Sequence, residues 1–132
     1  MTIGVVHSCF DLLHAGHILF LKRAKSQCDK LVAFLQTEAR PGKDPCVETL
    51  FERYTRLAAC KYVDEIIPYK TEKELADYLL TTAFDFRFIG EDWLDKIDTL
   101  TGIEFTRDKI VFIPREHHMS SSELRERLRK QN

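Results

Sequence analysis

HSCFDLLHAGH, residues 7–17, is the stretch that decides the fold of this 132-residue chain. An apolar run over 3–6 precedes it and predicts a strand, and the periodic segment 18–25 that follows it predicts a helix. His14 and His17 are three residues apart, so a helix that begins near Ala15 or Gly16 places both rings on one side of its first turn. The stretch is therefore predicted to connect a strand to a helix that starts with a histidine pair.

The start of this helix is a predicted site for negative charge. The first turn of a helix has free backbone N–H groups and the positive end of the helix dipole, both of which favour phosphate. Two imidazoles at the same place can stabilise charge that develops during phosphoryl transfer. A histidine pair alone is more often a surface or core detail, but Phe10-Asp11 and the flanking elements favour a phosphate-handling role.

The rest of the chain predicts strands alternating with helices. Apolar runs predict strands over 2–7, 30–36, 62–67, 86–89 and 110–113, and helical patterns cover 16–27, 47–60, 72–81 and 121–130. Residues 91–107 have no clear pattern. This order predicts one α/β domain over 1–132, doubly wound, with a five-stranded parallel sheet and helices on both faces.

Composition narrows the class of protein. The chain is 44% hydrophobic and 31% charged with a formal net charge of −1, so it is not expected to bind nucleic acid or membranes broadly. No apolar run approaches the roughly 18 residues that span a bilayer, and no signal peptide is predicted. The four cysteines form no Cys-x-x-Cys pair, which favours a reducing cytoplasm.

Three later segments also follow predicted strands, so they should meet the histidine pair at one edge of the sheet. The first is the loop from Arg40 to Lys43, which has two cations. The second is Gly90-Glu91-Asp92-Trp93, where glycine permits close approach of a ligand and the tryptophan can stack or pack. The third runs from Arg115 to Ser122, where Ser120 and Glu123 form a capping box that can coexist with phosphate contacts.

These segments resemble the nucleotidylyltransferase superfamily marked by His-x-Gly-His, and within it the cytidylyltransferases, with most similarity to those that act on glycerol 3-phosphate. The resemblance rests on His14-Ala15-Gly16-His17, on Gly90-Glu91-Asp92-Trp93, and on Arg115 followed by a serine run. It spans nearly the whole chain and implies a Rossmann-like domain. One departure is that His7-Ser8 stands where the family usually has an aromatic residue and glycine.

The resemblance implies a transferase that moves a cytidylyl group from CTP to a phosphorylated alcohol and releases pyrophosphate. Glycerol 3-phosphate is the implied acceptor, which would give CDP-glycerol for cell-envelope or capsule precursors. Mg²⁺ and a homodimer are implied as well.

The resemblance also assigns residues. The implied catalytic residues are His14, His17, Lys43 and Arg115, with Arg40 as a substitute for Lys43. Arg53 would contact the acceptor, and Asp11 is a candidate for contact with Mg²⁺. The implied nucleotide-binding residues are Cys9, Phe10, Asp11, Gly16, Gly90, Asp92, Trp93, Ser120, Ser121 and Ser122.

Three alternatives remain at this point. One is an adenylyltransferase on the same fold, and another is a cytidylyltransferase for a different sugar, polyol or amino-alcohol phosphate. The third is a metal-binding module in which Cys9, Asp11, His14 and His17 hold zinc.

Overall fold

The structure is a computed structural model that describes residues 1–115 and 121–131. Its centre is a parallel sheet in the order β3-β2-β1-β4-β5. The strands are β1 (Ile3–Ser8), β2 (Lys30–Gln36), β3 (Glu65–Tyr69), β4 (Phe86–Gly90) and β5 (Ile110–Ile113). The order reverses between β1 and β4, which is the switch point where ligands bind in such sheets. The predicted doubly wound, five-stranded sheet is confirmed.

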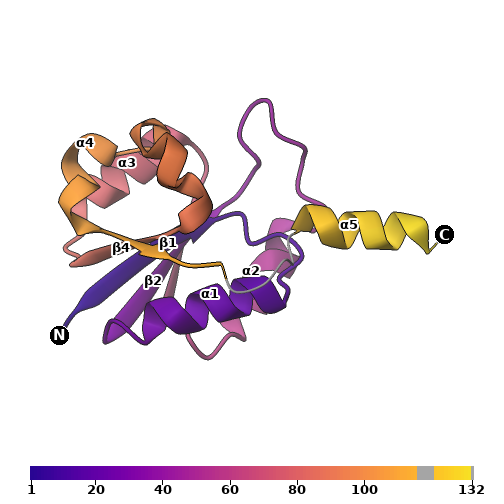
Figure 1. The fold of residues 1–132 in the computed structure, drawn as a ribbon, viewed down its shortest axis with the longest axis horizontal. Helices are drawn as coiled ribbons and strands as arrows, with labels where there is room; N and C mark the ends of the chain where they lie inside the picture. The colour runs from indigo at the N-terminus through magenta and orange to yellow at the C-terminus, as the bar shows by residue number, and fades with distance from the viewer. Residues whose placement is uncertain (116–120, 132) are drawn as a thin grey trace.

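Helices cover both faces of the sheet (Figure 1). The helices α1 (Ala15–Lys25) and α2 (Leu50–Ala58) lie on one face, and α3 (Glu72–Thr81) and α4 (Ile103–Thr106) lie on the other. The last helix, α5 (Ser121–Lys130), projects beyond the sheet on the side of the C-terminus. None of the helices in the described part of the chain has the length and apolar character needed to cross a bilayer.

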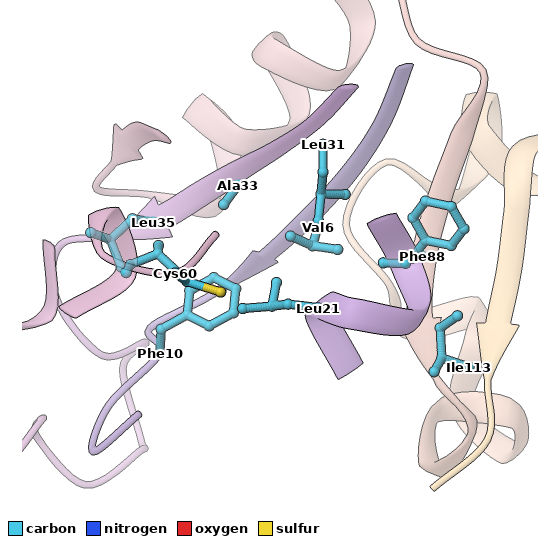
Figure 2. Packing of buried hydrophobic residues seen from close by; sticks show 11 residues of the cluster. Val6, Phe10, Leu21, Leu31, Ala33, Leu35, Cys60, Phe88 and Ile113 are labelled. Atoms are coloured by element: carbon cyan, nitrogen blue, oxygen red, sulfur yellow. The ribbon is translucent and has the colours of Figure 1, made fainter. Parts of the chain in front are cut away.

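Alternating side chains of β1 supply the core on each face. Val6 packs with Leu21 of α1 and Leu57 of α2 in one cluster of buried residues (Figure 2). Val5 points the other way and packs with Leu75 and other buried residues of the α3 face. Because neighbouring strand residues point to opposite faces, a strand buried on both faces has a continuous apolar run, as β2 has from Leu31 to Leu35.

Two predicted boundaries were wrong for local reasons. The second helix begins at Leu50 instead of residue 47, because Thr49 is its N-cap. Thr49 Oγ1 accepts the Glu52 N–H group, and Glu52 Oε1 accepts the Thr49 N–H group. The third strand is Glu65–Tyr69 instead of 62–67. This strand continues through Pro68. An edge strand such as β3 tolerates proline, because one of its sides forms no hydrogen bonds with another strand.

The segment without a clear pattern forms short helices. It contains the 3₁₀ helices η1 (Glu91–Thr99) and η2 (Arg107–Lys109) on either side of α4. Lys96 interrupts η1 with a non-helical backbone, so no single helical period runs through the sequence. Leu100 and Ile103 still pack on Ile89 of β4, which closes this side of the core.

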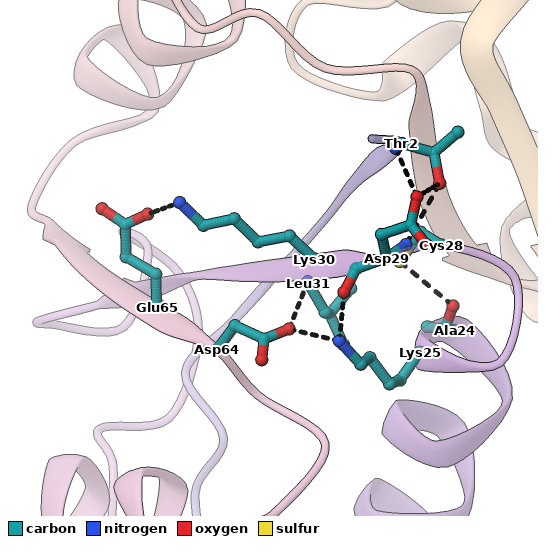
Figure 3. Close-up of polar contacts among 9 residues, drawn as sticks. All are labelled: Thr2, Ala24, Lys25, Cys28, Asp29, Lys30, Leu31, Asp64 and Glu65. Atoms are coloured by element: carbon teal, nitrogen blue, oxygen red, sulfur yellow. Dashed lines mark hydrogen bonds and ion pairs between the residues drawn. The ribbon is translucent and has the colours of Figure 1, made fainter.

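Ion pairs tie together the end of the sheet where the strands begin (Figure 3). Lys25 pairs with Asp64 at 2.7 Å, and Asp64 also accepts the Leu31 N–H group at 2.8 Å. Lys30 pairs with Glu65 at 2.8 Å. These contacts stabilise the edge of the sheet where the strands begin. The carboxyl ends of the strands lie at the opposite edge, where ligands bind in such sheets.

Candidate active site

His14 and His17 form a reciprocal cap at the start of α1. His14 Nδ1 accepts the Gly16 N–H group at 3.0 Å, and His17 Nδ1 accepts the His14 N–H group at 3.2 Å. The two rings are stacked with centroids 4.1 Å apart. The prediction that both rings lie on one side of the first turn is confirmed.

The cap also decides the tautomers of the two imidazoles. A neutral ring has one donor and one acceptor nitrogen, and in both histidines Nδ1 is the acceptor. The proton therefore lies on Nε2, which makes each Nε2 a hydrogen-bond donor. The first turn of α1 contains no acidic residue. Two neutral donors at the positive end of a helix suit an anion such as phosphate.

The loop before α1 has an unusual backbone. Phe10 and Leu12 have positive φ angles of 48° and 52°, which side chains of L-residues rarely adopt. The Phe10 ring is only 2% exposed, and its centroid lies 5.9 Å from that of His17. Phe10 therefore packs in the core and supports His17, which leaves its side chain no room to contact a nucleotide as predicted.

Asp11 lies between Phe10 and Leu12 and joins three parts of the chain. Its carboxylate accepts N–H groups of Val47 and Glu48 at 2.8 and 3.0 Å and the Arg125 guanidinium at 2.5 Å. Burial raises the pKa of Asp11, but these hydrogen bonds outweigh burial and hold the pKa below its usual value. With both oxygens engaged by donors, Asp11 acts as a structural anchor, and the structure does not support its predicted contact with Mg²⁺.

A cleft of about 320 Å³ opens next to this loop, beyond the ends of β1, β2 and β3. Five of the predicted site residues line it: Cys9, Asp11, Arg40, Lys43 and Trp93. His14, His17, Gly16, Gly90 and Asp92 are outside its lining. The histidine pair is linked to the cleft through the loop that contains Cys9 and Asp11.

Several residues of the cleft were missed by the sequence prediction: His7, Gln36, Tyr69, Glu72, Thr101 and Arg125. Gln36 and Tyr69 are the last residues of β2 and β3, so the rule that ligands bind at strand ends could have found them. Thr101 and Arg125 belong to segments whose position only the tertiary structure provides, and no sequence signal indicated them.

Cys9 is held as a neutral thiol. Burial, followed by the neighbouring Cys46, raises the pKa of Cys9 to about 12, and the thiol donates to Gln36 Oε1 at 3.4 Å. Zinc binds thiolate, so this environment disfavours it. Within residues 1–115 and 121–131, no group of three or more potential metal ligands comes together. The structure therefore does not support the zinc alternative.

Arg53 has a structural role in place of the predicted acceptor contact. It is 2% exposed, and its guanidinium donates to the carbonyl groups of Cys9, Gln36, Thr37 and Glu48 at 2.6–3.3 Å. Four of its five N–H groups are thus engaged by backbone. Arg53 joins β2, the first loop and the start of α2, and these contacts do not favour the predicted acceptor contact.

Trp93 lies between two cations at the edge of the cleft. Arg40 Cζ is 6.0 Å and Lys96 Nζ is 4.8 Å from its ring centroid. The ring also packs on the apolar cluster around Leu100. Trp93 therefore packs and lines the cleft at the same time. Gly90 has an ordinary backbone, and a Cβ atom there would come within 2.7 Å of Asp92 Oδ1.

The structure describes part of the predicted segment from Arg115 to Ser122. The Arg115 N–H group donates to Glu91 Oε1 at 2.8 Å, and the half-exposed guanidinium lies 4.0 Å from Glu123. Ser120 lies outside the described residues. Ser121 and Ser122 open α5, and their side chains lie outside the description as well.

A histidine pair that caps a helix at the switch point of a parallel sheet, beside a cleft with Arg40 and Lys43, is suited to hold nucleotide phosphates. Fold and site together define a Rossmann-like nucleotidyltransferase.

Comparison with known proteins agrees with this class. The family model described as cytidylyltransferase-like matches residues 5–127, and the chain belongs to this family. It is 30% identical to glycerol-3-phosphate cytidylyltransferase from Bacillus subtilis, over 94% of this chain and 95% of that protein. It is 37% identical to ethanolamine-phosphate cytidylyltransferase from Dictyostelium discoideum, over 90% of this chain but only 34% of that protein.

A solved structure supports the fold. The lipopolysaccharide core biosynthesis protein from Thermoplasma volcanium superposes with a TM-score of 0.72 over 90% of this chain and 99% of that one. At 22% identity, this likeness concerns the fold alone.

Proposed function

We propose that the protein transfers a cytidylyl group from CTP to a phosphorylated alcohol, with glycerol 3-phosphate as the acceptor and CDP-glycerol and pyrophosphate as products. The observation that supports this proposal most is the pair of Nε2–H donors that backbone hydrogen bonds hold at the start of α1. Such donors suit a reaction in which phosphate oxygens gain charge.

The proposed step is a substitution at the α-phosphorus of CTP. An anionic oxygen of the acceptor phosphate forms a bond to this phosphorus, and the bond to the bridging oxygen of the β-phosphate breaks. The electron pair leaves with pyrophosphate. Because the attacking oxygen is already anionic, no general base is needed, and catalysis consists of alignment and charge stabilisation.

Each residue of the site has a proposed role in this step. His14 and His17 donate to oxygens on and beside the α-phosphate. Lys43 and Arg115 hold the β- and γ-phosphates, and Arg40 assists from the same loop as Lys43. Trp93 offers its ring to the nucleotide. Other side chains on the walls of the cleft, such as His7 and Glu72, receive the acceptor, because this space lies at the ends of β1 to β3, next to the first loop.

We also propose that Mg²⁺ takes part, bound mainly to triphosphate oxygens. Mg²⁺ in nucleotide sites needs only one or two protein ligands and otherwise uses phosphates and water. A cage made of protein alone does not fit, since the described residues bring no three metal-binding side chains together.

A homodimer is the proposed assembly. Apolar side chains at the start of α2 are exposed, with Phe51 at 79% and Val47 at 61%. Exposed apolar patches of this kind often mark contacts between proteins. Light scattering on the purified protein tests this: a mass near twice 15.5 kDa is expected.

The proposed activity is tested by incubating the protein with each nucleoside triphosphate and a panel of phosphorylated alcohols, with products identified by mass spectrometry. CTP with glycerol 3-phosphate is expected to give CDP-glycerol. Transfer from ATP instead would replace the cytidylyl assignment with an adenylyl one. Transfer from CTP to a different acceptor would correct the acceptor only.

A further inference from the structure

A buried arginine contacts His7, one of the residues that line the cleft. Arg87 of β4 has no exposed surface, donates to Thr106 Oγ1 at 2.9 Å and lies 2.9 Å from His7 Nε2. In the described part of the chain, no carboxylate lies within ion-pair distance of it. Burial of a charge is costly unless hydrogen bonds offset the cost, so the contacts with Thr106 and His7 are the ones that retain this guanidinium in the core.

The contact with Arg87 decides which nitrogen of His7 is protonated. A guanidinium has donors only, so His7 Nε2 must be the acceptor of the pair. The proton of the neutral ring is then on Nδ1. Burial, followed by the positive charges of Arg87 and Arg40, lowers the pKa of His7 to about 3, so the ring stays neutral at physiological pH.

His7 is also a wall residue of the cleft. His7 is the second-last residue of β1 and lines the cleft. No described residue accepts a hydrogen bond from Nδ1. The cleft therefore contains a neutral donor whose tautomer is set from the core. This tautomer is opposite to that of His14 and His17, whose protons lie on Nε2.

An acceptor group lines the same cleft. Glu72, at the start of α3, accepts the Thr101 hydroxyl group at 2.7 Å and the Gln36 amide at 3.4 Å, and Arg40 Nε lies 3.9 Å from its Oε1. These neighbours hold the carboxylate in place, and it also acts electrostatically on Arg87. The cleft thus offers a neutral donor in His7 and a negative acceptor in Glu72.

A ligand group that contacts both His7 and Glu72 must accept one hydrogen bond and donate another. A hydroxyl group can accept from His7 Nδ1–H and donate to Glu72, so it satisfies both. An ammonium group can only donate, so it satisfies Glu72 and leaves the His7 donor unpaired. A donor without a partner in a desolvated site lowers affinity.

We propose that His7 is a specificity-determining residue of the acceptor subsite, which donates from Nδ1 to a free hydroxyl group of a polyol phosphate, and that Arg87 is its positioning residue. The inference rests on the proposed cytidylyl transfer. It predicts that the protein prefers a phosphorylated alcohol with a free hydroxyl group over one with an ammonium group.

Kinetics with two acceptors test the ligand contact. Wild-type protein should use glycerol 3-phosphate with a higher kcat/KM than ethanolamine phosphate. His7→Phe keeps a planar ring but removes the donor, and it should raise KM for glycerol 3-phosphate about three- to tenfold. KM for CTP and for ethanolamine phosphate should stay within about twofold. His7→Asn retains a donor near the Nδ1 position and should recover most of the loss. Equal changes for both acceptors, or no change, would overturn the proposal.

Nuclear magnetic resonance of the histidine rings tests the arrangement without turnover. His7, assigned by comparison with His7→Asn, should show the Nδ1–H tautomer, and its Nδ1 signal should shift when glycerol 3-phosphate is added. In Arg87→Met the ring should lose this tautomer preference and its pKa should rise, because one positive charge and one donor are gone. An Nε2–H tautomer, or no shift on addition of glycerol 3-phosphate, would refute the role of His7.

The proposed function and the role of His7 are contradicted by different results. If no phosphorylated alcohol is converted with any triphosphate, the proposed function is wrong. If conversion occurs while the His7 variants keep the acceptor preference of the wild type, only the role of His7 is wrong.

Discussion

Arg125 Nη2 lies 2.5 Å from Asp11 Oδ2 and joins α5 to the loop that precedes α1. The two residues are 114 positions apart in the sequence. The Asp11 carboxylate is 8% exposed, and the Arg125 side chain is 29% exposed. The ion pair is therefore partly buried. It connects the last helix to the loop beside the histidine pair.

Arg125→Ala should lower the free energy of unfolding by about 1–3 kcal/mol, because it leaves a buried carboxylate without its charged partner. Urea denaturation followed by circular dichroism measures the change. Arg129→Ala is the control on the same helix, since the Arg129 side chain is 76% exposed and pairs with the half-exposed Glu126. Its effect should stay below about 1 kcal/mol. Equal effects of the two variants would show that the Asp11 pair contributes no more than a surface pair.

Arg53→Met should lower the free energy of unfolding by more than about 3 kcal/mol, because several buried carbonyl groups lose their donor at a cost of about 1–3 kcal/mol each. KM for the acceptor should stay near the wild-type value at a temperature where the variant is folded. A stable variant with a greatly raised acceptor KM would restore the role that the family resemblance implied for Arg53.

His14→Asn separates the two functions of His14. Asparagine is a good N-cap, so the variant should keep the stability of α1 while it loses the Nε2–H donor. Its kcat should fall at least about a hundredfold, and CTP should bind within about tenfold of wild type, because the donor acts mainly on the transition state. His17→Ala should show the same pattern of loss in kcat. Stopped assays measure kcat, and calorimetry measures the binding of CTP. Near-normal turnover in His14→Asn would contradict the proposed step.

Arg115→Ala should weaken CTP binding about ten- to a hundredfold, because a charge-assisted hydrogen bond to phosphate is worth about 1.5–3 kcal/mol. Arg115→Lys should recover part of the affinity, since an ammonium cannot reproduce the guanidinium fork. Arg107→Ala is a control, because the Arg107 side chain is 57% exposed and pairs with the exposed Asp98. If Arg107→Ala and Arg115→Ala bind CTP equally well in calorimetry, Arg115 makes no contact with phosphate.

The low pKa of His7 predicts a specific dependence of stability on pH. His7 has a pKa of about 3 in the folded protein against 6.5 in the unfolded chain, so between these values the unfolded chain binds one more proton. Stability should be independent of this group above about pH 6.5. It should fall as the pH decreases below that, by at most about 1.4 kcal/mol per pH unit. Denaturation at several pH values should show a shallower decline in His7→Asn, and parallel curves would contradict the low pKa.

Local patterns were sufficient for most of the secondary structure. The bounds of β2, α3, β5 and α5 agree with the prediction, because each has a run or period that no neighbouring cap disturbs. Errors arose where side chains set the ends, as at Thr49, or where an edge strand contains a proline, as at Pro68. Residues 91–107 could not be predicted, since 3₁₀ turns have no extended period.

The candidate site was predicted where its geometry is local. The spacing of His14 and His17 within one helical turn was enough to place both rings together. The structural role of Arg53 was not predicted, because the partners of its guanidinium, the carbonyl groups of Cys9, Gln36 and Thr37, lie 16–44 residues away in the sequence. A buried arginine and a ligand-binding one look the same in a sequence.

The sequence by itself determined the doubly wound sheet, the strand-to-helix connection and the histidine pair, because strand periods, helix periods and the spacing within one helical turn are local properties of the chain. Only the tertiary structure decided the tautomer of His7, the anchoring of Asp11 by Arg125 and the walls of the cleft. Each of these depends on a contact between residues 80 or more positions apart, as between His7 and Arg87, or on the meeting of several strand ends. Such contacts exist only after the sheet has brought distant segments to one edge, and no local pattern encodes them.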